Sequence, residues 1–307
     1  MTNDRLAAQL ALFSTQMADD PTFASRFHRG EVDLNGNPVP RNPEAVETAF
    51  ELERRMEALA LVGDVVTQAT RSRLGGLPDL PNGLEWPERQ GIPLTFVAQI
   101  DFAELPRTMV LDWLPTSGLL FFFVTQGLDI WNAADRSLRT VLYALPNDKL
   151  CNPVLVPENL PEVIGARNLS FRLVPSYRPI SWMTLEGLHH GADFDEFSMR
   201  LSRLDKRRDA LELYQIGGWP ELNQEGYMPL QCEHVVTGAS TALPHDWRNQ
   251  ANANANPGGW RLLLQLELAA LPGRAGGEWE EHGYFWVREA DARRCDFSNV
   301  LLFADSD

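Results

Sequence analysis

The clearest pattern of apolar and polar positions in this chain is an alternating segment that occurs twice. Residues 96–102 read Phe-Val-Ala-Gln-Ile-Asp-Phe, and residues 262–268 read Leu-Leu-Leu-Gln-Leu-Glu-Leu. Every second residue is apolar in both, which is the period of a β-strand with one face buried. Each segment has a glutamine at its centre and continues into Ala-x-Leu-Pro. The agreement in phase predicts two copies of one β-unit.

A Gly-Gly turn precedes each of these strands. Residues 74–80 read Leu-Gly-Gly-Leu-Pro-Asp-Leu, and residues 216–222 read Ile-Gly-Gly-Trp-Pro-Glu-Leu. Turn and strand lie farther apart in the second copy, which carries an insertion containing a polar Asn-Ala stretch typical of an exposed loop. After the strand, Gly118 aligns with Gly283, each directly before an apolar run.

Apolar residues recur at helical spacing in three places outside the repeated blocks. These segments are residues 6–20, residues 44–61 and residues 195–213. Residues 1–61 contain no copy of the repeated blocks, so we expect them to form an N-terminal helical arm. The third segment predicts a surface helix between the two units.

The fold predicted from these patterns is α+β and mainly β, with two internally related, roll-like units and an N-terminal helical arm. The arm takes residues 1–61 and the double unit residues 62–307. Within the double unit, the first copy covers about 62–150 and the second about 214–307, with a linker and the surface helix between them. The 21 prolines and 22 glycines favour a β-rich fold over a helical bundle, because many turns between short elements need them.

Composition narrows the compartment and the partners. The net charge of -15 disfavours nucleic acid, because phosphate binding needs a concentrated basic surface. Three widely spaced cysteines imply no disulfide framework and a reducing compartment. No apolar run approaches the length of about 18 residues that a membrane helix needs, and the N-terminus lacks a secretory pattern. We therefore expect a cytoplasmic protein that binds neither membranes nor nucleic acid.

The order of these blocks resembles the YwqG-like family of bacterial proteins, which carries a domain-of-unknown-function label. The blocks that carry the resemblance are residues 72–81, 86–87, 91–101 and 117–122, followed by 217–220, 262–265, 283–286 and 296–300. The resemblance covers residues 65–305 and implies a β-rich, roll-like fold built from two related halves. It implies no activity and no catalytic residues, since none is settled for that family.

Asp79 and Glu221 occupy equivalent positions after the proline of each turn. If a pseudo-twofold axis relates the units, the two carboxylates could meet as an acid/base pair or a cation site. The favoured alternative is that each acid accepts backbone N–H bonds in its own turn, a common role for acids in turns.

Gln99, Gln265, Trp86 and Trp219 are the other candidate binding residues. A buried amide must find hydrogen-bond partners. The glutamines are therefore expected either to line a pocket between the units or, as the favoured reading, to satisfy backbone groups where the sheet bends. Trp86 and Trp219 stand beside proline and glycine turns, where a ring is better placed to bind a partner than inside a strand.

Other motifs offer no reactive site. Residues 189–196 hold two histidines and three acids, but their spacing fits no known metal site and is typical of a solvated loop. The segment 238–242 lacks the second glycine of a nucleophile elbow, and no phosphate-binding glycine-rich loop occurs. We expect no catalytic residue, no metal and no cofactor.

Two functional hypotheses follow. The leading one is a non-enzymatic protein-binding module that uses an acidic, aromatic surface near the Gly-Gly turns, in an immunity-like role that neutralises a basic protein. The alternative is a small-ligand-binding protein or enzyme with a pocket at the junction of the two units, lined by Asp79, Glu221 and the two glutamines.

Overall fold

The structure is a computed structural model that describes part of the chain. The described residues are 57–107, 111–125, 139–145, 156–160, 163–177, 179, 214–222, 227–238, 258–267 and 281–306. The chain divides into two compact units, residues 1–57 with 185–204 and residues 58–184 with 205–307. Apart from Glu57, the described residues belong to the second unit. The predicted helices over 6–20 and 195–213, most of the predicted helix 44–61, and the loop 189–196 lie outside them.

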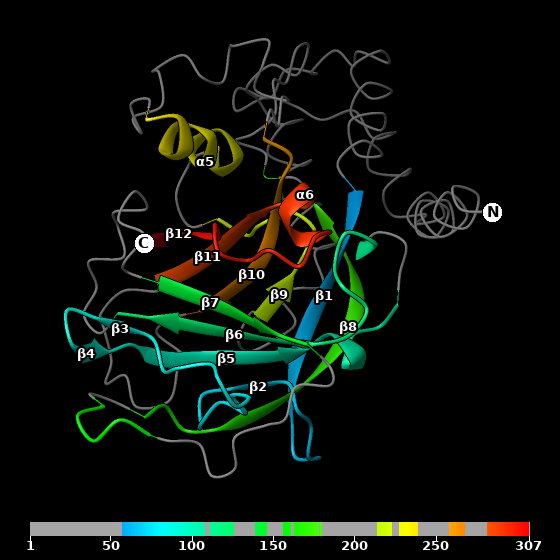
Figure 1. Cartoon of the computed structure of the whole chain (residues 1–307). Helices are drawn as coiled ribbons and strands as arrows, with labels where there is room; N and C mark the ends of the chain where they lie inside the picture. Colours follow the sequence, from blue (N-terminus) through cyan, green and yellow to red (C-terminus); the bar gives the residue numbers. More distant parts are fainter. Residues whose placement is uncertain are drawn as a thin grey trace, which may run out of the picture. The chain divides into compact units, whose positions relative to one another are not determined.

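The described strands form one ten-stranded sheet and one small hairpin (Figure 1). The sheet order is β12-β11-β10-β9-β1-β8-β2-β5-β6-β7. Its strands are β1 (Glu57–Val66), β2 (Arg73–Leu74), β5 (Thr95–Asp101), β6 (Leu119–Val124), β7 (Arg139–Ala144), β8 (Arg167–Tyr177), β9 (Tyr214–Ile216), β10 (Trp260–Glu267), β11 (Glu281–Arg288) and β12 (Leu301–Ser306). The hairpin pairs β3 (Glu88–Arg89) with β4 (Ile92–Pro93).

The helices of the described ranges are few and short. They are the 3-10 helix η1 (Phe102–Glu104), α5 (Met228–Thr237) and α6 (Glu289–Ala292). None of them has the length and apolar character of a membrane-crossing helix. The described part of the protein is therefore mainly β, as the sequence predicts.

Two halves of the chain exchange one strand at the centre of the sheet. We call β1–β7 the first half and β8–β12 the second half. β1 pairs with β9 of the second half, whereas β8 pairs with β2 of the first half. Outward from the centre the order is then the same on both sides, β2-β5-β6-β7 and β9-β10-β11-β12, with antiparallel pairing. Neither half completes its own sheet, so the two form one continuous structure.

The position predicted for the C-terminal end of one helix is wrong. Residues 57–61, expected to be the last residues of the helix over 44–61, belong to β1. Ala60, Leu61 and Val62 are all fully buried because β1 is covered on both faces at the centre of the sheet. A strand buried on both faces is continuously apolar and cannot be told from a buried helix by periodicity alone.

Strand β8 was missed by the sequence analysis, which assigned residues 151–213 to a linker and a surface helix. The signal was present, because Leu169 and Phe171 alternate with polar Asn168 and Ser170 as a strand requires. In the structure Leu169 and Phe171 are buried in the core.

The pairing register also corrects one alignment made from the sequence. Gln99 pairs with the residue three places after Gly118, whereas Gln265 pairs with Tyr284, the residue directly after Gly283. Superposing the two glutamines therefore leaves the two glycines out of step, and Gly118 and Gly283 are not equivalent.

The inner face of the sheet buries one apolar core that both halves share. The ring of Phe122 in β6 meets Phe285 in β11 edge-on, with centroids 5.0 Å apart. Arg139 Nε in β7 donates to the carbonyl oxygen of Val300, just before β12, at 3.1 Å. This bond links the two edges of the sheet, which nearly closes on itself.

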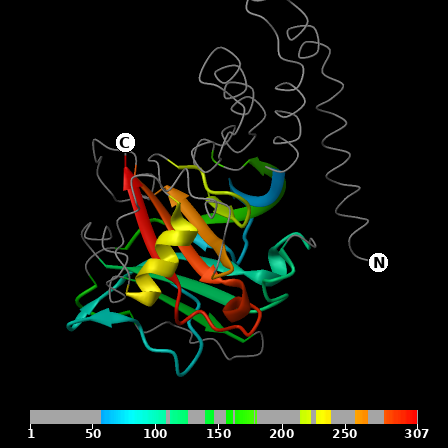
Figure 2. The ribbon, with the colours of Figure 1, turned by 90° about the horizontal axis from the view of Figure 1, so that it is seen from above.

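The outward face of each half has its own cover. In the second half, α5 lies across β10, β11 and β12 (Figure 2), and its Met228 and Cys232 pack in one cluster with Trp286. In the first half, Leu80 and Leu94 from the segment before β5 pack with the outward phenylalanines of β6. The described residues therefore form a shared inner core and, on the outward face of each half, a separate outer cluster.

Candidate functional site

Three polar side chains hold the first Gly-Gly turn. Arg73 in β2 donates two hydrogen bonds to the Asp79 carboxylate, at 2.7 and 3.1 Å. Gln99 in β5 accepts the backbone N–H of Asp79 at 2.8 Å and donates to the Asp79 carboxylate at 2.9 Å. Its amide also donates to the Arg71 carbonyl oxygen at 2.8 Å. The donors and the acceptor of the Gln99 side chain are thus all used within the fold.

The electrostatics of Asp79 suit a structural role. Burial raises the pKa of its carboxyl, but the hydrogen bonds from Arg73 and Gln99 and the charges of Arg73 and Arg71 outweigh burial, so the pKa lies below its ordinary value. A general acid or base works best with a pKa near the operating pH. A carboxylate held ionised by a guanidinium fork is therefore poorly suited to proton transfer.

The second Gly-Gly turn has equivalent contacts made by amides. Gln265 accepts the backbone N–H of Glu221 at 2.9 Å and donates to the Glu221 carbonyl oxygen at 2.8 Å. Gln215 in β9 lies opposite Gln265 in β10. In the first half, Arg73 in β2 lies opposite Gln99 in β5 in the same way. The amide of Gln215 donates to the Trp219 carbonyl oxygen at 2.7 Å.

The structure places the two turns on separate outward faces. The strand neighbours of Gln99 and Gln265 point into the shared core, so the two fully buried glutamines point outward on their own halves. β2 and β9 are separated by β8 and β1, which is about 14 Å at the usual strand spacing. Asp79 and Glu221 are not brought together, and each glutamine serves the turn of its own half.

Trp86 and Trp219 are half-buried and pack against their own halves. Trp86 Nε1 donates to the Leu94 carbonyl oxygen at 2.9 Å, and its ring meets Phe123 edge-on with centroids 5.5 Å apart. Trp219 packs against the cluster under α5, and its backbone N–H donates to Ser176 Oγ at 3.0 Å. Both rings therefore help to cover the outward faces.

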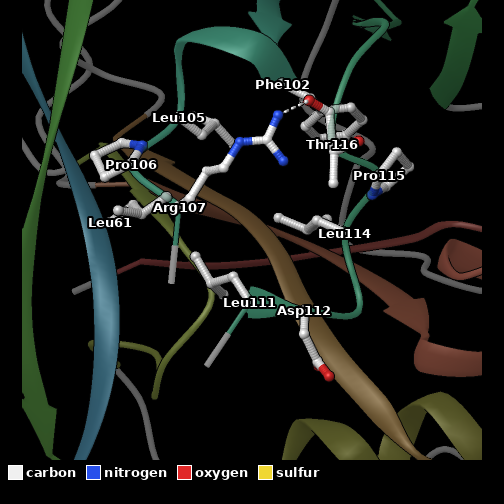
Figure 3. A pocket seen from close by; sticks show the side chains of 10 residues that line it. All are labelled: Leu61, Phe102, Leu105, Pro106, Arg107, Leu111, Asp112, Leu114, Pro115 and Thr116. Atoms are coloured by element: carbon white, nitrogen blue, oxygen red, sulfur yellow. Dashed lines mark hydrogen bonds between the residues drawn. The ribbon is translucent and has the colours of Figure 1, made fainter. Parts of the chain in front are cut away.

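A hollow of about 370 Å³ opens in the first half, beside the place where residues 111–116 contact the second half (Figure 3). Its walls come from β1, from η1 with the residues after it, and from the loop before β6. The apolar lining includes Leu61, Phe102, Leu105, Leu111 and Leu114, all buried members of the shared core. Small-molecule sites usually measure roughly 300–1,000 Å³ and are mostly apolar. We call this hollow the junction cleft.

Two contacts fix the loop 111–116 against the second half. Leu111 packs so closely on Gly217 that a Cβ there would overlap Leu111 Cδ2. Arg293, after α6, donates to the Asp112 carboxylate at 2.8 Å and to the Asp112 carbonyl oxygen at 3.1 Å. Hydrogen bonds to Glu289 and to Asp112 raise the pKa of Arg293. The rim of the junction cleft therefore depends on both halves.

Sequence reasoning missed the junction cleft. Its residues follow no strand or helix period, and they come from segments that the fold brings together. One signal was present, because residues 105–116 lie in the sequence between two strands and yet are largely apolar. Loops normally run over the surface, so an apolar loop between strands indicates a buried or ligand-facing segment.

The described ranges bear on two other kinds of reactive site, a metal site and a reactive thiol. Within them no group of three or more His, Cys, Asp or Glu side chains is placed to hold a metal ion. Cys232 is fully buried in α5, and burial raises the pKa of its thiol. Thiols of that kind are unreactive. The polar side chains at the junction cleft are those of Arg107, Asp112 and Thr116.

Comparison with known proteins assigns a family to most of the chain. No curated protein matches it. Residues 72–305 match the model of the family described as Domain of unknown function (DUF1963). That range contains both Gly-Gly turns and the loop that lines the junction cleft. The chain therefore belongs to the DUF1963 family.

Proposed function

We propose that this protein is a non-enzymatic binding protein that takes a small, largely apolar molecule into the junction cleft. The observation that carries the proposal is the cleft itself: core leucines line a hollow that opens to the outside. Each buried CH₂ contributes about 0.8 kcal/mol. A hydrocarbon ligand can therefore gain affinity from this wall without any reactive group.

This proposal favours the small-ligand alternative over the protein-binding hypothesis. A protein partner was expected to use Asp79, Trp86, Trp219 and Glu221. The contacts described above engage Asp79 with Arg73 and use both rings to cover the outer clusters. The hypothesis of a basic, immunity-like partner then rests on the net charge of -15 alone.

Four further proposals accompany this one. We infer that the two halves are copies of one unit, which is supported by the equivalent bonds of Gln99 and Gln265 and by the positive φ of both glycines in each turn. The narrower YwqG-like assignment is supported by the order of the blocks. A helical arm, now ending before β1 at residue 56, and a cytoplasmic location are supported by helical spacing and cysteine use in the sequence.

A steric test decides whether the junction cleft binds. Decanol is titrated into the wild-type chain by calorimetry, together with Leu114→Trp, which fills the hollow, and Thr116→Trp, which covers its exposed rim. Val236→Trp, at an exposed position on α5, is the matched control. We expect binding to the wild type and the control and at least tenfold weaker binding to both cleft variants. Because Thr116 is exposed, that variant reports even if the buried substitution impairs folding.

Two results contradict the proposal. One is no binding of decanol to the wild-type chain. The other is equal binding to the wild type and to Thr116→Trp, which would place the ligand elsewhere.

A further inference from the structure

We infer that the ligand of the junction cleft is an amphipathic acid, with a compact apolar body and an anionic head held by Arg107. This inference rests on the proposed function and adds the chemical class of the ligand. Arg107 directly follows the apolar residues Leu105 and Pro106 in the cleft wall. In Figure 3 its guanidinium lies across the hollow, toward Thr116 and Leu114.

The guanidinium of Arg107 has no carboxylate partner among the described residues. Its Nη2 donates to the Thr116 carbonyl oxygen at 3.3 Å. A guanidinium carries five N–H donors in a planar fork. The bond to Thr116 orients that fork over the cleft and leaves most of its donors available to a ligand.

The acids nearest to Arg107 in the chain are used elsewhere. Both oxygens of Glu104 accept backbone N–H groups, from Arg71 at 2.8 Å and from Ser72 at 2.7 Å. Asp101 pairs with the Arg71 side chain at 3.1 Å and accepts the Ala103 N–H at 2.9 Å. These carboxylates therefore bind other groups of the fold and do not pair with Arg107.

The acid on the opposite rim is likewise occupied. Asp112 pairs with Arg293 at 2.8 Å, and its charge is thereby compensated. The net charge that the described lining residues present to a ligand is therefore positive.

The excess of positive charge at the cleft is informative because the chain as a whole is acidic. The chain has 42 acidic residues and 27 basic ones. In such a protein a basic side chain commonly finds an acid nearby, as Arg73, Arg288 and Arg293 do. A guanidinium beside an apolar hollow, with the neighbouring acids engaged, fits a carboxylate or phosphate head whose tail fills that hollow.

The test compares three ligands with one tail and different heads: decanoate, decyl phosphate and decanol. Affinities are measured by calorimetry for the wild type, Arg107→Gln and Arg107→Lys, with Arg261→Gln as the control. Like Arg107, Arg261 is exposed to solvent, but it lies in β10 and does not line the cleft. Replacing it with glutamine makes the same change in net charge as Arg107→Gln.

We expect one acid to bind the wild type about tenfold more tightly than decanol, a difference in the range of a charge-assisted hydrogen bond. Arg107→Gln removes that difference and leaves decanol unchanged. Arg107→Lys retains part of it, because the charge is kept and the fork is lost. Arg261→Gln behaves as the wild type. The comparison of decanoate with decyl phosphate identifies the head group.

The inference is overturned if decanol binds as tightly as both acids, or if Arg107→Gln and Arg261→Gln weaken the acids equally. In either case the binding of decanol still supports the junction cleft as a binding site. Failure of all three ligands to bind overturns the inference and the proposed function together.

Discussion

The first and second Gly-Gly turns make equivalent hydrogen bonds with different side chains. In the first, Arg73 donates to the Leu77 carbonyl oxygen and also pairs with Asp79. In the second, Gln215 stands in the place of Arg73 and donates to the carbonyl oxygen of Trp219, which is the counterpart of Leu77. A charged clamp on one side thus corresponds to a neutral amide clamp on the other.

The two turns therefore share the bonds that fix their backbone but differ in the charge of the side chains involved. The bonds that fix the backbone are kept in both turns, whereas the ion pair between Arg73 and Asp79 corresponds to a neutral amide in the second half. The shared contacts with each glutamine support a structural role for both turns. The functional site that we propose is therefore the junction cleft, with Arg107 beside it.

The largest effect should come from adding a side chain to the first turn. Gly75 has φ +57, and a Cβ there would lie 2.6 Å from the Gly165 carbonyl oxygen and 2.7 Å from that of Ile164, both backbone atoms. The equivalent Gly217 meets only the end of the Leu111 side chain, which can rotate away. We expect Gly75→Ala to cost about 3 kcal/mol of unfolding free energy and Gly217→Ala about half of that.

Urea unfolding checks this prediction. The control is Gly238→Ala, which shares the left-handed φ but has open space around it, so it should cost about 1 kcal/mol. Equal losses for all three variants would show that φ alone matters and that the backbone approach at Gly75 does not.

The next effect compares the two central glutamines. Gln99→Leu and Gln265→Leu each leave a backbone N–H of the preceding turn without its partner, so each should cost about 2 kcal/mol. Gln99→Leu should cost somewhat more, because the Asp79 carboxylate also loses a donor. Chemical denaturation of the single and double variants measures the loss of unfolding free energy at each glutamine. Losses below about 0.5 kcal/mol would contradict the structural role of the glutamines.

The smallest effect is a pH dependence confined to the first turn. The folded pKa of Asp79 lies below its ordinary value, so its carboxylate stabilises the fold above about pH 4 and loses that contribution as the pH falls through the folded pKa. Wild type should exceed Asp79→Asn by about 1 kcal/mol near neutral pH, with the difference shrinking below about pH 4. Denaturant midpoints from neutral pH to about pH 3 measure it.

Arg73→Gln sharpens the same comparison, because it makes the first turn resemble the second. We expect most of the acid sensitivity to disappear in this variant, with a smaller loss of stability than in Gly75→Ala. If Arg73→Gln keeps the full pH dependence, the ion pair is not the cause of it.

The fold was predictable from sequence where local pattern and tertiary environment agree. The alternating strands around Gln99 and Gln265 and the two Gly-Gly turns have a period or a composition that only one local structure fits. Strand β1 was misread at its start because its burial on both faces removes the alternation. The exchange of β1 and β8 between the halves depends on long-range pairing, which no local pattern encodes.

The candidate site was less predictable than the fold. The sequence indicated the repeated residues because a repeat can be recognised from the amino-acid sequence alone. The junction cleft is assembled from Leu61, residues 102–107 and residues 111–116, and its rim is fixed by Arg293 from the far end of the chain. Such a convergence exists only after the sheet has curled and its two edges have met.

The most direct test of the account is hydrogen exchange of the wild-type chain with and without decanoate, read segment by segment. The account predicts slower exchange in residues 102–107 and 111–116 on binding, with residues 74–80 and 216–222 unchanged. Slower exchange in the two Gly-Gly turns, with the cleft segments unchanged, would contradict it and return the binding site to the repeated residues.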